Sequence, residues 1–168
     1  STPIKSSAAS DVYKRQIVAI TNSVNLIDGL DGLANGVSAI SATTMLVIAM
    51  LASEGQVAVA MAALVGASVG FMPYNLNPAK MFMGDTGATF LGYILATMSI
   101  QGLFKYYAVI SFVVPFLILG LPIFDTTFAF IRRIAHGQSP MHADRSHIHH
   151  RLIDMGLNQK QAVATLYV

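Results

Sequence analysis

The chain has 168 residues, of which 54% are apolar and 11% are charged, whereas a soluble domain has roughly 25% charged residues. Together with long uncharged runs, this composition indicates an integral membrane protein and excludes an ordinary soluble domain. The net charge of +2 gives no reason to expect nucleic-acid binding, and the lack of cysteine excludes disulfides and thiolate chemistry.

The first sixteen residues are polar and rich in serine and alanine, without the apolar segment of a secretory signal peptide. We interpret residues 1–16 as a non-native or disordered leader. Residues 17–168 are then a partial membrane domain whose N-terminal half is missing.

A polar motif in residues 22–34 reads NSVNLIDGLDGLA. It places Asn22, Asn25, Asp28 and Asp31 at intervals of three residues, so that each is a helical neighbour of the next. An interval of three drifts against the helical period of 3.6, and the glycines of the motif permit a break. We therefore predict a helix that ends or unwinds near Asp28 and displays polar groups at a membrane surface. A polar helix cap beside a loop is the alternative.

The rest of the chain predicts an all-α fold, a polytopic transmembrane bundle with about four to five spans. The uncharged runs are residues 33–52, 57–72, 88–104 and 108–131, and residues 158–168 resemble the start of another span. Pro115 and Pro122 should kink or split the fourth span. Residues 73–80, with two prolines and two asparagines, predict a loop.

Counting the spans places every unusual polar cluster on one side of the membrane. Residues 28–31, 73–85 and 132–156 share this side, whereas Glu54 and Lys105 lie on the other. The shared side also carries most of the basic residues of the spans and loops, which predicts a cytoplasmic face. The polar clusters can therefore form a single site.

Asp85 lies in the sequence GDTG of residues 84–87, at the entry to the third span. One interpretation is a helix N-cap, for which aspartate is well suited. The other is a ligand of Mg²⁺, which favours carboxylate oxygens and phosphates, beside a helix N-terminus that attracts phosphate. We favour the metal ligand, because a cap does not account for the acidic motif on the same side.

The basic segment before residue 156 contains Arg145, His147, His149 and His150. Such a segment is typical of a loop that contacts anionic headgroups, of a zinc site, or of a phosphate-binding site formed by arginine and histidine donors. The residues alone do not rank these three alternatives.

Two classes of function fit this pattern. The first is a Mg²⁺-dependent membrane enzyme that acts on a phosphorylated, lipid-linked substrate. The second is an ion-coupled transporter, which would also contain broken helices and acidic residues. Transporter acids are expected near the middle of the bilayer, whereas these acids lie at the ends of the spans. The pattern therefore favours an enzyme acting at the membrane surface.

Three motifs, in residues 22–34, 78–87 and 146–152, resemble those of the polyprenyl-phosphate N-acetylhexosamine-1-phosphate transferases, or glycosyltransferase family 4. The resemblance extends over essentially everything after residue 17. It implies an enzyme of the bacterial inner (cytoplasmic) membrane, with its active site on the cytoplasmic face. Such an enzyme transfers a sugar 1-phosphate from a UDP-sugar to undecaprenyl phosphate and releases UMP, the first membrane step of cell-envelope polysaccharide synthesis.

The resemblance also implies roles for particular residues. Asp85 matches the family's Mg²⁺ ligand, with Mn²⁺ as the alternative ion. For the oligomeric state, a homodimer is the alternative to a monomer. Asp28, Asp31 and Asp85 are implied to be catalytic. The residues implied to bind substrate are Asn25, Asn75, Phe82, Arg145, His147, His149 and His150.

Two departures from the family pattern affect these expectations. The family's upstream Asp-Asp pair and first spans are not in this sequence, so we expect the chain alone to be inactive. The spacing His147-Ile-His-His150 resembles the glucosamine branch, whereas the muramoyl-pentapeptide branch has three consecutive histidines. This favours UDP-N-acetylglucosamine as the donor, with the muramoyl-pentapeptide donor as the alternative.

Overall fold

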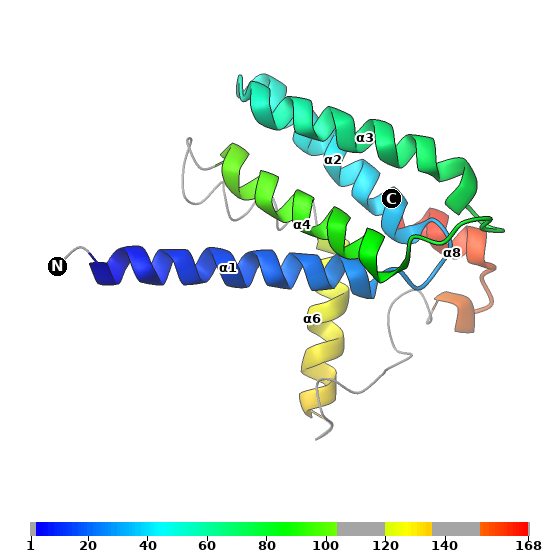
Figure 1. The fold of residues 1–168 in the computed structure, drawn as a ribbon. Coiled ribbons are helices and arrows are strands. Elements are labelled where there is room, and N and C mark those ends of the chain that lie inside the picture. Colours follow the sequence, from blue (N-terminus) through cyan, green and yellow to red (C-terminus); the bar gives the residue numbers. More distant parts are fainter. Residues whose placement is uncertain (1–2, 104–119, 136–151, 168) are drawn as a thin grey trace.

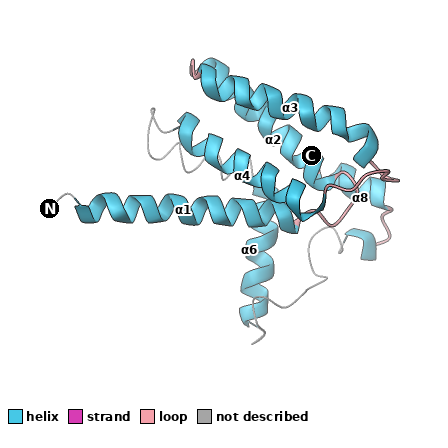
Figure 2. Ribbon diagram, in the orientation of Figure 1, coloured by secondary structure: helices cyan, strands magenta, loops and turns pink. Residues whose placement is uncertain are grey.

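The computed structural model describes residues 3–103, 120–135 and 152–167, and within these ranges it contains helices and loops but no strand (Figures 1 and 2). The labelled helices are α1 (Pro3–Leu26), α2 (Leu33–Leu51), α3 (Gly55–Asn75), α4 (Gly84–Leu103), α6 (Gly120–Ala135) and α8 (Gln159–Leu166). The predicted all-α fold is thus confirmed. Helix α1 includes most of residues 1–16, whose origin stays a prediction.

Helices α2 and α3 have the length and composition of membrane spans, with 19 and 21 residues. At 1.5 Å per residue α2 is about 28 Å long, close to the thickness of a bilayer's hydrocarbon core. Helix α4 occupies the third predicted span with 20 residues. Helix α6 occupies the end of the fourth predicted span, and Pro122 lies in its first turn, where a missing N–H is tolerated.

Helices α1, α2, α3 and α4 alternate in direction, so that the α1–α2 turn and the α3–α4 loop lie at the same end of the bundle (Figure 1). Helices α2 and α3 pack side by side, α4 packs against α1, and α6 crosses α1. The end of α1, the start of α2, the loop between α3 and α4, and α8 lie together on the right of Figure 1. The structure thus brings residues 28–31 into contact with the loop within residues 73–85, whereas the common membrane side predicted for these segments and for residues 132–156 stays a prediction.

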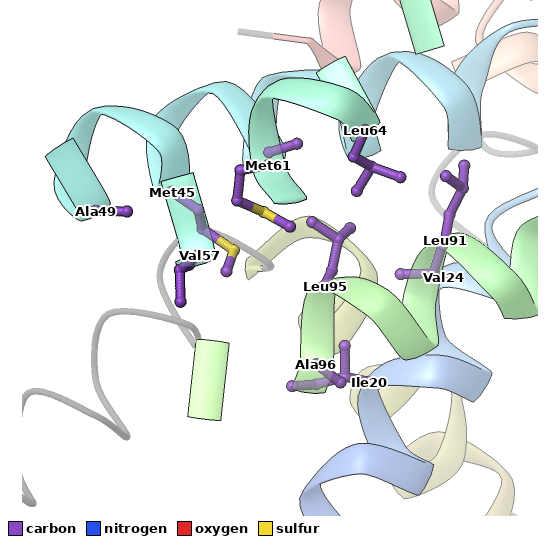
Figure 3. Packing of buried hydrophobic residues seen from close by; sticks show 11 residues of the cluster. Ile20, Val24, Met45, Ala49, Val57, Met61, Leu64, Leu91, Leu95 and Ala96 are labelled. Carbon is purple, nitrogen blue, oxygen red and sulfur yellow. The ribbon is translucent and has the colours of Figure 1, made fainter. Parts of the chain in front are cut away.

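Buried apolar side chains from α1, α2, α3 and α4 form the core between the helices (Figure 3). Met45 and Met61 fill the space between α2 and α3, while Leu95 of α4 lies against this pair and is fully buried. Flexible methionine side chains suit the irregular gaps between helices that cross at different angles. This core holds α1 and α4 in place relative to α2 and α3.

Glycine allows a close approach between α1 and α4. A Cβ atom on Gly92 would lie 2.9 Å from the Cα and 3.0 Å from the carbonyl oxygen of Thr21. Because these are backbone atoms, a side chain at Gly92 would push the two helices apart. Small residues serve the same purpose in helix packing within lipid. The close approach sets the distance between the end of α1 and the start of α4.

A buried hydrogen bond from a side chain of α2 to the backbone of α3 joins the two helices. The Nδ2 atom of Asn35, which is 1% exposed, donates to the carbonyl oxygen of Ser68 at 3.0 Å. The same atom contacts the sulfur of Met72 at 3.6 Å. In an apolar environment this bond satisfies a group whose burial would otherwise be unfavourable.

The structure corrects one predicted boundary and defines the C-terminal element. The loop predicted for residues 73–80 begins later, because α3 continues through Pro73 to Asn75. Pro73 lies in the last turn, where its missing N–H removes one bond but does not stop the helix. Within residues 158–168, which resemble the start of a span, Gln159–Leu166 form the eight-residue helix α8, which packs against the start of α2.

Candidate active site

The turn between α1 and α2 holds two acidic residues of the first motif. Helix α1 ends at Leu26, as the spacing of the motif predicts, and α2 begins at Leu33. Gly32 has φ of +82° at the N-cap of α2, a conformation that glycine adopts without strain. Ile27 and Leu30 are buried, so they anchor the turn, while Asp28 and Asp31 remain partly exposed.

Asp28 and Asp85 approach each other at this end of the bundle. Partial burial raises the pKa of Asp28, and the negative charge of Asp85 raises it further. Asp85 is exposed in the first turn of α4, where the helix N-terminus favours a negative charge. One carboxylate from the α1–α2 turn and one from the first turn of α4 thus lie close enough for their negative charges to repel, and a cation bound between them would relieve this repulsion.

The loop between α3 and α4 folds back on the end of α3. The backbone N–H groups of Lys80 and Met81 donate to the carbonyl oxygen of Tyr74 at 2.8 Å and 2.9 Å. The Nδ2 atom of Asn75 donates to the carbonyl oxygen of Met81 at 3.1 Å from a buried position. These hydrogen bonds fold the loop back on the end of α3. The side chain of Phe82, which follows Met81, is 75% exposed and is available to stack on a planar group.

Asp31 binds the same loop from the α1–α2 turn. Its Oδ2 atom accepts from the Nδ2 of Asn77 at 3.0 Å and from the backbone N–H of Ala79 at 3.1 Å. Hydrogen bonds to a carboxylate are stronger than those between neutral groups. In this structure Asp31 therefore joins the two segments that carry the candidate site residues.

The described residues fit a magnesium ion. Asn25, in the last turn of α1, has a buried Oδ1 atom with no hydrogen-bond partner among the described residues. Asp28, three residues further along the chain, and Asp85 supply carboxylate oxygens at the same end of the bundle, while no group of three or more His, Cys, Asp or Glu forms a metal site within the described ranges. Mg²⁺ is often held by one or two carboxylates, and phosphates and water complete its coordination.

Helix α8 covers the α1–α2 turn from the other side. Ala162 and Val163 are buried against a cluster that includes Ile27 and Leu33. The hydroxyl of Tyr167 donates to the carbonyl oxygen of Gly32 at 2.6 Å. Burial raises the pKa of Tyr167, which keeps this donor protonated. The turn is thus held between α8 and the core of the bundle.

An apolar cavity of about 640 Å³ lies between α1 and α6. Its lining includes Ala19, Ile20, Ile123 and Phe130, and it extends along α1 to Asn22. Asn22 itself donates to the carbonyl oxygen of Val18 in its own helix, so it does not join the acidic site. The cavity could accommodate an apolar chain near the acidic end of α1.

The structure brings together some of the predicted site residues and leaves others undescribed. Asp28 and Asp85 approach each other, and Asp31, Asn75 and Phe82 belong to or contact the same loop. The predicted residues Arg145, His147, His149 and His150 lie outside the described residues. The motifs gave no signal for Asn77, Gln159 and Tyr167, because a single polar residue in a loop or short helix is not distinctive.

Known proteins resemble this chain over most of its length. Residues 14–103 match the model of glycosyl transferase family 4. A probable undecaprenyl-phosphate N-acetylglucosaminyl 1-phosphate transferase of Bacillus subtilis is 51% identical over 154 residues, which cover 90% of this chain and 42% of the relative. A decaprenyl-phosphate N-acetylglucosaminephosphotransferase of Mycolicibacterium smegmatis is 35% identical over 170 residues, with the same coverage of each.

Relatives with a different name match a shorter stretch of this chain. A phospho-N-acetylmuramoyl-pentapeptide-transferase of Staphylococcus aureus is 48% identical over 84 residues, or 50% of this chain and 26% of the relative. The chain thus spans less than half the length of these relatives. The family model nevertheless covers more than half of the chain, including the α1–α2 turn and the start of α4. The chain belongs to glycosyl transferase family 4.

Proposed function

We propose that this chain forms part of a transferase that moves N-acetylglucosamine 1-phosphate from UDP-N-acetylglucosamine to a polyprenyl phosphate. The observation that supports it best is the approach of Asp28 and Asp85 at the end of the bundle where the α1–α2 turn and the α3–α4 loop meet. The relatives that cover 90% of the chain are named for transfer of this sugar phosphate to undecaprenyl or decaprenyl phosphate. Among the described acids, those of the motifs lie at helix ends, which also favours an enzyme over an ion-coupled transporter.

The reaction requires one anion to attack another. An oxygen of the polyprenyl phosphate forms a bond to the β-phosphorus of the UDP-sugar, and the bond from this phosphorus to the bridging oxygen breaks. UMP leaves with the bridging oxygen, and the product is a polyprenyl diphosphate sugar. The exposed ring of Phe82 suits stacking on the uracil, and the apolar cavity beside α1 suits the polyprenyl chain.

Mg²⁺ is the cofactor that we propose for this site. Asp85 would hold it, with Asp28 facing it and the oxygen of Asn25 nearby in sequence. A bound Mg²⁺ neutralises charge on a diphosphate and orients it. Asp85 and Asp28 would keep the cation at the end of the bundle, where a soluble UDP-sugar and a lipid phosphate can both reach it.

The site is proposed to face the cytoplasm of a bacterial cell. The chain contains no cysteine, so single cysteines report topology without background. Lys80→Cys lies in the exposed loop of the site, whereas Ser53→Cys lies at the opposite ends of α2 and α3. We expect a membrane-impermeant maleimide to label Ser53→Cys in intact cells and Lys80→Cys only after lysis. Labelling of both from the same side would contradict the topology.

A second candidate is transfer of phospho-N-acetylmuramoyl-pentapeptide. It is favoured by the 48% identity to the Staphylococcus aureus enzyme, although this match covers only half of the chain. The two candidates differ in the donor and share the acceptor, the released UMP and the proposed metal site. Comparing the two UDP-sugars as donors therefore distinguishes them.

The decisive experiment supplies the remainder of the protein. The chain is co-expressed in membranes with the part of the Bacillus subtilis relative that it does not cover, and UMP release is measured with undecaprenyl phosphate. We expect release from UDP-N-acetylglucosamine with both parts present and none from either part alone. Preference for the muramoyl-pentapeptide donor would assign the second candidate. Lack of release from both donors, with both parts folded in the membrane, would contradict the proposed function.

A further inference from the structure

Asn77 connects three segments that are far apart in the sequence. Its Nδ2 atom donates to Oδ2 of Asp31 at 3.0 Å and to Oε1 of Gln159 at 2.7 Å. Asp31 belongs to the α1–α2 turn, Asn77 to the loop that carries Phe82, and Gln159 to the first turn of α8. All three side chains are partly buried, so these bonds are less exposed to competition by water.

Gln159 is not needed to cap its own helix. Asn158 is the N-cap of α8, and its side chain accepts from the N–H of Gln161 at 2.9 Å. The side chain of Gln161 in turn accepts from the N–H of Asn158 at 3.0 Å, which completes a capping box. With the helix end satisfied in this way, the side chain of Gln159 is directed instead to Asn77.

The position of α8 is fixed independently of Gln159. The other end of the helix is held by the bond from Tyr167 to Gly32, and a Cβ atom on Gly36 would overlap the ring of Tyr167. Ala162 and Val163 pack between these two ends. Helix α8 is therefore a fixed support from which Gln159 can restrain the loop.

We propose that Gln159 is a positioning residue, which acts through Asn77 to hold the loop carrying Phe82 against Asp31. The loop is already closed on itself by its bonds to Tyr74 and Asn75. The hydrogen bonds that the loop donates to Asp31 and Gln159 fix where the loop lies relative to the α1–α2 turn. This inference rests on the proposed function only for its effect on substrate, because the restraint itself is measurable without turnover.

The restraint is tested by hydrogen exchange on the full chain in detergent micelles. Gln159→Leu removes the acceptor and keeps the bulk of the side chain, Gln159→Glu keeps an acceptor oxygen, and Lys160→Leu is the matched control on the exposed neighbour. We expect amides of Ala79 to Met81 to exchange about five to ten times faster in Gln159→Leu, since one net hydrogen bond is lost. Gln159→Glu should restore slow exchange and Lys160→Leu should not change it.

Two outcomes would overturn the positioning role. One is unchanged exchange of the loop in Gln159→Leu while α8 keeps its own protection. The other is faster exchange throughout α8 and the α1–α2 turn, because Gln159 would then support folding generally. Asn77→Asp provides a second variant that retains the size of the side chain but places oxygens against Asp31 and Gln159. It should accelerate loop exchange more than Gln159→Leu, and equal or slower exchange would also count against the role.

The effect on substrate is measured in the two-part enzyme. Gln159→Leu should raise the KM for the UDP-sugar about three- to tenfold with a smaller change in kcat, because Phe82 would be misplaced in the free enzyme. Gln159→Glu should return KM toward its original value. An unchanged KM together with faster loop exchange would overturn the link to substrate. If no variant, including the unsubstituted chain, releases UMP, the proposed function fails, while hydrogen exchange still decides whether Gln159 restrains the loop.

Discussion

Asp85→Asn is expected to lower UMP release by the two-part enzyme at least about a hundredfold, because it removes the carboxylate that would hold the cation beside the diphosphate. Asparagine retains the size of the side chain and one oxygen, but not the negative charge. Asp85 is exposed, so the substitution should leave thermal unfolding almost unchanged. Loss of activity with an unchanged fold is the signature of a site residue.

A metal titration separates this expectation from other effects on activity. Mn²⁺ is paramagnetic and can replace Mg²⁺ as a probe, so its binding is followed by electron paramagnetic resonance. Asp85→Asn should weaken Mn²⁺ binding, whereas Asp154→Asn, which changes an exposed carboxylate outside the site, should not. Near-normal activity of Asp85→Asn at low Mg²⁺ would remove Asp85 from the metal site.

The two acids of the α1–α2 turn should respond in opposite ways to the same substitution. Because the pKa of Asp28 is raised in the folded chain, by burial and by Asp85, the folded state binds its proton more tightly than the unfolded state. Stability therefore falls as pH rises from about 3.8, the unperturbed pKa, through the raised value. Ionised Asp28 destabilises the metal-free fold at neutral pH, so Asp28→Asn should stabilise it there while lowering activity at least about a hundredfold.

Asp31→Asn should instead destabilise the fold by about 1–3 kcal/mol, because it weakens the bonds from Asn77 and Ala79 to a charged acceptor. Unfolding midpoints of both variants are compared from pH 4 to pH 8 in a chelating buffer, so that no divalent ion changes the charge of the site. The advantage of Asp28→Asn should vanish toward the acidic end. A loss of stability in Asp28→Asn at neutral pH, or a gain in Asp31→Asn, would contradict the assigned environments.

Local signals in the sequence predicted much of the fold and part of the site. The uncharged runs predicted α2, α3 and α4, and the interval of three in the first motif predicted that a helix ends or unwinds near Asp28, as α1 does at Leu26. Span counting predicted that the acidic turn and the α3–α4 loop meet. Each of these signals depends on residues close together in the chain, or on the requirement that spans alternate in direction.

Contacts between distant segments could not be predicted in this way. Asn77 and Gln159 are 82 residues apart, and nothing in either local sequence indicates that they form a bond. The resemblance implied that Asn75 binds substrate, which stays a prediction, and it gave no sign that the buried Nδ2 atom of Asn75 donates to Met81. Pro73 predicted a helix end, yet the packing of α3 extends the helix past it. In each case tertiary contacts decided what local propensity left open.

The bond between Asn35 and Ser68 contributes to the register between the two helices that lead to the acidic end. Helix α2 follows the turn that carries Asp31, and α3 precedes the loop that carries Asn77. Sliding one helix past the other by a single residue would move these groups about 1.5 Å, enough to break bonds of 3.0 Å. Apolar packing in the core opposes such a slip, and the buried hydrogen bond adds a contact whose length and direction permit little shift. A single side-chain amide between two spans thus helps to keep the groups of a site at the membrane surface in register.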